Sequence, residues 1–424
     1  MKPNAPNNVN PVLISWSIAA LATAGVVTRP FKWPEAVWAC AGAALIVVFG
    51  LLPAHLAWQA IGKGGDVYLF LIGMMLLSEV ARQEGLFDWV AALTVNHARG
   101  SPRRLFLLVY LVGVVTTTFL SNDATAVVLT PAVFAVAKQA RTRPLPLLFI
   151  CAFIANAASF VLPISNPANL VLYGDRMPAL GAWLARFALP SVVSVVATCG
   201  LLYWSQRDAL RGECASGVDV HPLGAGGRLA LGAIGVATVM LLAVSALDRP
   251  LGLPTASLGV ATAVLVSWKK RSAPWPLLRH LSWSVLPLVA GLFVLVETLD
   301  HTGVIRMLAG ALQALAGHDA ATAYGAAGAI AAFGSNAINN LPAGLIASST
   351  AAQAHSPEAV IDALVIGVDL GPNLSVTGSL ATILWLTALR REGEEVGFWQ
   401  FLKVGSVVMI PALALVLGAR WLMG

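Results

Sequence analysis

Charged residues are scarce in this chain. Only 26 basic and 20 acidic residues occur among 424, whereas about a quarter of the residues in a soluble globular protein are charged. Long apolar runs recur between residues 11 and 421, and 58% of the residues are hydrophobic. Because a helix needs about 20 apolar residues to cross a bilayer, the composition excludes a soluble globular protein and predicts an all-helical, polytopic membrane protein.

Cysteine is equally scarce, and the four cysteines stand singly, without CxxC or Cys/His spacing, at Cys40, Cys151, Cys199 and Cys214. Neither a metal site nor a disulfide framework is indicated. The sequence also lacks a nucleophile paired with a base and a phosphate-binding loop, so we expect no enzyme and no cofactor. The net charge of +6 falls in loops, where it sets membrane orientation, and does not indicate nucleic acid.

The apolar runs predict about ten transmembrane helices, five in each half of the chain. In the first half we expect crossings at 12–28, 36–51, 67–83 and 180–204, with a re-entrant hairpin and a broken helix over 145–173 between the last two. In the second half we expect crossings at 227–246, 254–268, 283–299 and 402–422, with a hairpin over 320–350 and a broken helix over 359–389. The polar segment 205–226 is the expected cytoplasmic linker within a single transporter domain.

The two halves, 12–204 and 227–422, read as repeats of each other. The Ser-Asn step at 121–122 recurs at 335–336, and residues 156–169 lie over 369–382 at an offset of 213. One constant offset of 218 relates Gly73, Glu79 and Gly85 to Gly291, Glu297 and Gly303. Since each half crosses five times, the second half is expected to enter the bilayer upside down, as an inverted repeat.

The basic residues predict the orientation of this arrangement. Nineteen of the 26 Lys and Arg residues fall on one face and seven on the other, and the face with nineteen should be cytoplasmic. Both termini would then lie outside the inner membrane. The alternative is a twelve-crossing protein with both termini inside.

Four polar segments interrupt the apolar runs, at 121–125, 163–169, 335–342 and 371–379. They combine helix-interrupting Pro or Gly with short Ser, Asn and Thr side chains that can cap freed backbone groups. Irregular backbone at membrane depth is tolerated only inside protein or beside a wet cavity. We therefore expect two hairpin tips and two broken helices to surround one midplane site, which is the plan of a secondary transporter.

The charge of the four breaks restricts the ligand. They contain no Lys or Arg, which disfavours a clamp for a di- or tricarboxylate and suits a neutral hydroxylated solute or a small cation. Asp123 lies within the first break, beside Asn122, and Asp369 lies just before the fourth; an acid inside the membrane is a candidate proton or cation carrier. The alternative is that each acid only forms a salt bridge or caps a helix. Glu79, with Arg82 one turn later, and Glu297 are expected to be structural.

The same residues carry a resemblance to a known family. The run DLGPNLSVTGSLATILWL at 369–386 closely resembles the second-half signature of the arsenite and antimonite efflux permeases (ArsB family) of the ion transporter superfamily. NNLPAGLIASS at 339–349 resembles its hairpin. SNDATAVVLTP and FIANAASFVLPISNPANL resemble its first half.

The resemblance implies an elevator fold and proton-driven export of arsenite or antimonite as neutral trihydroxy species, in some members with a cytoplasmic arsenite-stimulated ATPase. It also implies superfamily site positions at Asn122, Ser165, Asn166, Asn336, Gly378 and Ser379. Together with three further polar residues of the breaks, the candidate substrate-binding set is Ser121, Asn122, Ser165, Asn166, Asn336, Asn339, Asn373, Gly378 and Ser379.

Other transport functions remain open on the same residues. The sodium-coupled carboxylate branch of the superfamily shows a Ser-Asn-Thr triplet twice, whereas this chain reads Ser-Asn-Asp at 121–123 and Ser-Asn-Ala at 335–337. That departure weighs against a sodium-coupled carboxylate transporter. A sodium-proton antiporter on the same fold, and a channel with re-entrant filters, are the further alternatives.

Overall fold

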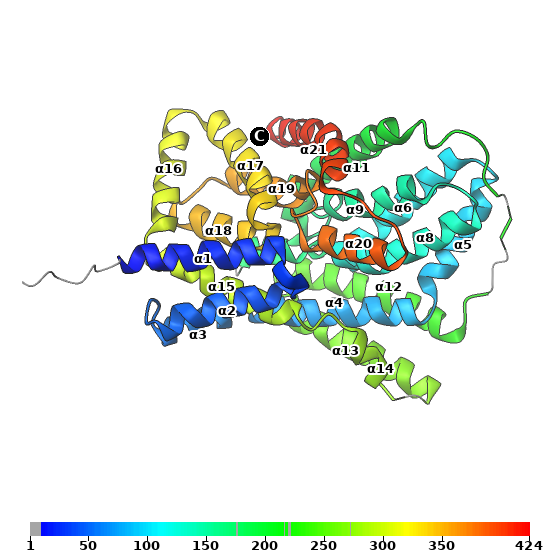
Figure 1. The fold of residues 1–424 in the computed structure, drawn as a ribbon, viewed down its shortest axis with the longest axis horizontal. Helices are drawn as coiled ribbons and strands as arrows, with labels where there is room; N and C mark the ends of the chain where they lie inside the picture. The colour runs from blue at the N-terminus through cyan, green and yellow to red at the C-terminus, as the bar shows by residue number, and fades with distance from the viewer. Residues whose placement is uncertain (1–9, 175–176, 216, 219–221, 272) are drawn as a thin grey trace, which may run out of the picture.

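The structure is a computed structural model that describes residues 10–174, 177–215, 217–218, 222–271 and 273–424 (Figure 1). Within these residues every regular element is helical, which confirms the expected fold class. Five helices are long and apolar enough to cross a membrane, and two bent helix pairs raise that number to seven. The five are α1 (Pro11–Thr28), α6 (Pro102–Leu120), α11 (Leu180–Gln206), α12 (Ala225–Ala246) and α21 (Phe398–Trp421). The chain is therefore a polytopic membrane protein.

Helices occupy all ten places where the sequence predicts a crossing. The remaining unbroken ones are α2 (Glu35–Val48), α4 (Gly65–Gln83), α13 (Gly252–Lys270) and α15 (Val285–His301). The broken ones are α9 (Pro144–Ala157) with α10 (Pro167–Tyr173), and α19 (Glu358–Leu370) with α20 (Leu380–Arg391). Several of these are shorter than a full crossing, so length and composition alone support fewer spans than ten.

Both expected hairpins are present. The first joins α6 to α7 (Asn122–Ala124), the π-helical turn η2 (Thr125–Leu129) and α8 (Thr130–Gln139), and the second joins α17 (Ala320–Ile338) to α18 (Asn340–Gln353). Four further helices were not expected: α3 (Ala54–Lys63), α5 (Leu86–Ala98), α14 (Trp275–His280) and α16 (Val304–His318). They fall at equivalent places, before and after α4 and before and after α15. The order of elements is thus the same in both halves, whereas the inversion and the repeat boundaries stay predictions.

The segment between α11 and α12 is attached to the first half. Asn96 of α5 donates to the carbonyl of Val218 (3.0 Å) and accepts from its N–H (2.8 Å). The backbone N–H groups of Cys214 and Ala215 donate to carbonyls of Gly100 and Ala140. Parts of this segment lie outside the described residues, and its cytoplasmic location stays a prediction.

Helices α1–α4 and α12–α15 lie together in the lower part of Figure 1, and we call this group the scaffold. Its closest approach is between α4 and α13, where Gly73 lies against the backbone of Thr255 and Gly259 lies against the backbone of Gly73. Small residues allow such backbone contact between membrane helices. Glu79 pairs with Arg82 (2.6 Å) and Glu297 with Lys63 (2.7 Å), so both glutamates make ion pairs within the scaffold.

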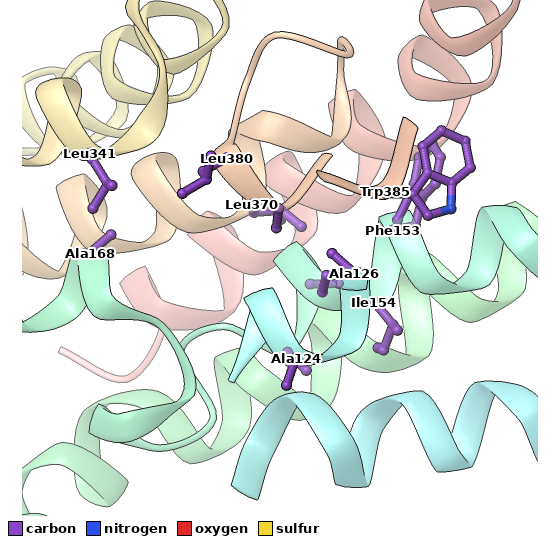
Figure 2. Packing of buried hydrophobic residues seen from close by; sticks show 14 of the residues in the cluster. Ala124, Ala126, Phe153, Ile154, Ala168, Leu341, Leu370, Leu380 and Trp385 are labelled. Carbon is purple, nitrogen blue, oxygen red and sulfur yellow. The ribbon is translucent and has the colours of Figure 1, made fainter. Parts of the chain in front are cut away.

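The two hairpins and two broken helices, with α11 and α21, form a second group that we call the hairpin body. Its apolar centre joins both halves of the chain, because Trp385 of α20 packs against Phe149 of α9 and Phe401 of α21. Figure 2 shows Phe153 and Trp385 among the buried residues of this centre, and the Trp385 indole N–H donates to the carbonyl of Leu148 at 2.8 Å. The two broken helices are thereby held against each other.

Candidate functional site

The two hairpin tips share an unusual backbone conformation. Ser121 has φ 111° and ψ 162°, and Asn339 has φ 74° and ψ 153°, a region that is otherwise almost confined to glycine. The two residues are 218 positions apart, which is the offset that relates Gly73 to Gly291. Strain of this kind costs about 1–3 kcal/mol and is common at ligand sites. The tips are therefore equivalent places in the two halves.

This geometry corrects the expected alignment of the tips. The sequence places Ser335 and Asn336 opposite Ser121 and Asn122, but α17 continues through Ile338 and the chain breaks at Asn339. Helix propensity carries α17 past the polar step, since Ser335 and Asn336 satisfy their side chains by donating to carbonyls of the preceding turn. The counterpart of Asn122 is therefore Asn340.

Four helices begin inside the breaks, each with a Ser or Asn residue at its N-cap. Ser121 and Asn339 precede α7 and α18, while Asn166 accepts from the N–H of Ala168 (3.0 Å) at the start of α10. Ser379 accepts from the N–H of Thr382 (3.1 Å) at the start of α20. Because side-chain caps satisfy the first N–H groups, the chain can interrupt a helix here without leaving backbone donors unpaired.

The broken helices of the two halves are joined by amide hydrogen bonds. Asn156 of α9 donates to the Oδ1 of Asn373 at 3.0 Å, and Asn373 donates to the carbonyl of Phe153 at 2.9 Å. Asn166 donates to the Oδ1 of Asp369 at 2.8 Å. All four polar side chains are almost completely buried. The structure therefore pairs Asn166 with Asp369 and Asn373 with Asn156, each across the two halves, while a shared substrate site stays a prediction.

Several other candidates brace the breaks. The Asn336 amide donates to the carbonyl of Gly371 (2.9 Å) and accepts from the N–H (3.0 Å) and hydroxyl (2.8 Å) of Ser375. The Gly378 carbonyl accepts from the Asn340 N–H at 2.9 Å, and a Cβ at Gly378 would collide with Pro372 and Asn336. Ser165 donates to the carbonyl of Thr118 at 3.1 Å. These contacts hold the tips against the broken helices.

Three buried acceptors beside the breaks have no hydrogen-bond partner among the described residues. They are Oδ1 of Asn156, Oδ1 of Asn340 and Oδ2 of Asp369. An unpaired buried acceptor costs about 1–3 kcal/mol, so each of these three atoms would gain from a donor supplied by water or by a ligand. Asn156 and Asn340 were not among the sequence candidates. The constant offset of 218 from Asn122 is the signal that could have identified Asn340.

The two acids occupy different surroundings. Asp369 is fully buried in α19, with Asn166 on one carboxylate oxygen. Asp123, in the first turn of α7, is half-buried and lines a cavity of about 60 Å³ together with Ser121, Glu79 and His280. Neither acid takes part in an ion pair among the described residues. The structure does not place the two acids in one hydrogen-bonded unit, so a shared proton between them is not indicated.

The described residues contain no group of three or more His, Cys, Asp or Glu that could hold a metal ion. The chemistry of the breaks is therefore that of amides, hydroxyls, two carboxylates and helix N-termini. Such groups form several individually weak hydrogen bonds to a small polar ligand.

Comparison with known proteins places this geometry in context. A family model described as citrate transporter matches residues 18–367. The arsenical pump membrane protein of Yersinia enterocolitica is 27% identical over 430 residues, which cover 96% of this chain and 98% of that protein. The protein of the same name in Escherichia coli K12 is 26% identical over 423 residues, with the same coverage.

Two further similarities concern transporters. An uncharacterized transporter of Mycobacterium tuberculosis H37Rv is 28% identical over 401 residues, which cover 91% of this chain and 92% of that protein. The crystal structure of the Alcanivorax borkumensis YdaH transporter, described as having an unusual topology, superposes with a TM-score of 0.57 over 97% of both chains at 17% identity. At that identity the likeness shows a common fold.

Proposed function

The chain belongs to the CitMHS family, described as citrate transporters, and we propose that it is a secondary transporter. We propose further that it exports trivalent arsenite and antimonite from the cell in exchange for protons. Two relatives named arsenical pump membrane proteins, similar over nearly the whole chain, support this substrate class. The proposed location is the inner membrane, with both termini outside.

The observation that carries the proposal is the set of unpaired acceptors at Asn156, Asn340 and Asp369. A trihydroxy metalloid offers three O–H donors on a small uncharged centre. Buried acceptors without partners gain most from such donors, because binding removes their desolvation penalty. We assign Asn122 and Asn340 to substrate binding at the tips, and Ser165, Asn336, Gly378 and Ser379 to holding the tips in place.

The family description favours one other candidate substrate, citrate. Citrate is polyanionic at neutral pH, and its recognition normally uses Arg or Lys. The four breaks contain neither, and they place the Asp369 carboxylate beside the amides. A polyanion would therefore meet repulsion without compensation, which favours the neutral substrate.

The test is arsenite uptake into everted membrane vesicles with an acidic lumen, with and without sodium, and with citrate uptake measured in parallel. The proposal expects pH-driven arsenite accumulation that needs neither sodium nor ATP. Accumulation of citrate without arsenite would refute it. Flux that appears only with ATP and cytosol would instead indicate dependence on an ATPase partner.

The acids are tested in the same vesicles. Asp369→Asn and Asp123→Asn are each expected to lower gradient-driven uptake at least about tenfold if the residue carries the proton, because an amide cannot exchange it. Asp208→Asn is the matched control, since Asp208 is exposed and paired with Arg211 far along the chain from the breaks. Full activity of both test variants would remove the proton-carrier assignment.

A further inference from the structure

A second cavity, lined by charged, polar and apolar residues, lies away from the hairpin tips and contains neither Ser121 nor Asn339 in its lining. Its volume is about 320 Å³, and it lies between the scaffold and the hairpin body. The scaffold contributes residues of α3, α4, α15 and the turn between α12 and α13, while Leu170, Leu345, Ser348 and Ser349 come from α10 and α18.

This cavity and the 60 Å³ cavity beside Asp123 are equivalent places in the two halves. The offset of 218 relates Val67, Phe293, Glu297 and Leu345 of the large cavity to Val285, Met75, Glu79 and Val127 of the small one. The offset of 213 relates Val171 to Leu384 in the same way. The structure thus has one vestibule for each half, and only the one beside Glu297 is roomy.

The residues that line the large vestibule carry a net negative charge, whereas the chain as a whole carries a net positive charge. Four acidic and two basic residues line it, in a protein whose net charge is +6; they are Asp66, Asp248, Glu297, Asp300, Lys63 and Arg249. Lys63 is engaged by Glu297 at 2.7 Å, Asp66 accepts from the N–H of Gly252 at 2.8 Å, and Asp300 accepts from Gln353 at 2.5 Å. Asp248 also lines the cavity and is exposed.

An unpaired hydroxyl provides a second, independent observation. Some buried helical hydroxyls in this protein donate to the carbonyl four residues earlier, as those of Ser15, Thr255 and Thr298 do. Ser245 lines the vestibule and is only 4% exposed, yet its Oγ has no partner among the described residues. This oxygen is therefore available to a ligand or to its hydration shell.

We propose that the large vestibule collects the cation that drives the proposed exchange, the proton as hydronium, with Asp248 supplying the attracting field and Ser245 a short-range oxygen ligand. Na⁺ serves as a second probe of the same field. The inference rests on the proposed function for the role of that cation. A cleft with an excess of one charge raises the local concentration of the counter-ion and the rate of its arrival. Most of the charged lining belongs to the scaffold, so the site would receive the cation without itself carrying it across.

Coulomb's law sets the size of the effect. A unit charge about 4–8 Å away in water changes the local concentration of a monovalent cation about two- to sixfold, and ionic strength above roughly 0.5 M screens most of this. Asp248→Asn should therefore raise the cation concentration for half-maximal arsenite flux about two- to sixfold at low salt, with the maximal rate unchanged. Arg249→Gln should lower it by a similar factor.

The experiment uses everted vesicles whose lumen is loaded with graded pH in one arm and graded Na⁺ in the other, with choline chloride to set ionic strength. The opposite shifts of Asp248→Asn and Arg249→Gln should disappear at high choline chloride. Ser245→Ala, which leaves the charge unchanged, should raise the half-maximal concentration at every ionic strength. Asp208→Asn is the control and should shift nothing.

Shifts of Asp248→Asn and Arg249→Gln in the same direction, or no shift in either arm while wild-type flux is normal, would overturn the vestibule assignment. Absence of wild-type arsenite flux would refute the proposed function instead. In that event, equilibrium binding of ²²Na⁺ to the purified full-length protein, with competition by H⁺, decides the vestibule separately: binding weakened by Asp248→Asn and Ser245→Ala supports it, and unchanged or absent binding refutes it.

Discussion

At the scale of single residues, the second hairpin tip contains Asn336 and Asn340, two asparagines whose side chains have different hydrogen-bonding partners. Asn336 uses its whole amide on protein partners, whereas the Oδ1 of Asn340 has none among the described residues. The sequence singled out the first because it follows a serine, as Asn122 does. Hydrogen-bond accounting in the folded chain separates a bracing asparagine from one free to bind.

We predict that Asn340→Ala and Asn336→Ala fail in different ways. Removing an acceptor that has no partner should leave thermal stability within about 1 kcal/mol of wild type, while arsenite flux falls at least about tenfold. Removing the Asn336 amide strands the Gly371 carbonyl and the Ser375 donors, and should cost roughly 2–4 kcal/mol. Thermal unfolding in detergent, beside vesicle flux, measures both. Equal stability losses would contradict the distinction.

At the scale of elements, the scaffold depends on contact between α4 and α13 without intervening side chains. A Cβ at Gly73 would overlap the backbone of Thr255, and no side-chain rotation relieves a backbone clash. The sequence shows Gly73 as a repeat marker, but only packing shows what the absent side chain makes room for.

We therefore predict that Gly73→Ala destabilises the protein by about 1–3 kcal/mol, through separation of α4 from α13. Gly232→Ala is the matched control, because Gly232 lies within α12 and a Cβ there meets nothing within 4 Å. That control should be neutral or slightly stabilising, since alanine is the better helix former. Unfolding temperatures of the two variants in the same detergent decide the matter, and similar losses in both would rule out the packing explanation.

A buried ion pair fastens α19 to α21. Asp362 is fully buried and accepts from the Nε (2.9 Å) and Nη2 (2.8 Å) of Arg420, with the hydroxyl of Tyr173 at 3.2 Å. Without Arg420, the buried Asp362 carboxylate keeps only one ionic contact among the described residues, the longer one to Arg186, whose Nη1 lies 3.8 Å from Oδ1, so most of its charge is left uncompensated.

Arg420→Met should accordingly cost about 3–5 kcal/mol, whereas the double variant Asp362→Leu with Arg420→Met should recover most of that loss. Chemical unfolding of the reconstituted protein measures the three variants. A double variant as unstable as the single one would show that the pair does more than satisfy its own charges.

At the scale of the whole molecule, the order of helices repeats, and the two vestibules are equivalent in position but unequal in volume. The vestibule beside Glu297 has a volume of about 320 Å³ and the one beside Asp123 about 60 Å³, so the two halves are equivalent in sequence position but not in shape.

Orientation gives the prediction at this scale. With both termini outside, alkaline phosphatase fused after Gly424 should be active in cells, and green fluorescent protein at the same place should be dark. The same reporters inserted at residue 212, in the segment between α11 and α12, should behave in the opposite way, because that segment lies among the nineteen basic residues of the cytoplasmic face. Fluorescence at the C-terminus would favour the twelve-crossing alternative.

The sequence by itself determined the class of fold, the places of the ten helices that it predicts as crossings, and the approximate location of the four breaks; the number of crossings stays a prediction. Apolar length and interrupting polar segments are local properties, and the cost of unpaired backbone in lipid permits few solutions. The short helices α3, α5, α14 and α16 were missed because they are too short or too polar to register as crossings.

Only the tertiary structure decided which polar residues are free. The pairing of Asn166 with Asp369 and of Asn156 with Asn373 joins residues more than 200 positions apart, and no local pattern specifies it. The second tip moved from Ser335 to Asn339 for the same reason: where a helix ends depends on which partners its polar side chains find once the chain is folded. The apolar composition therefore specifies the helical membrane fold, whereas long-range hydrogen bonds determine which polar side chains brace the breaks and which have no partner among the described residues.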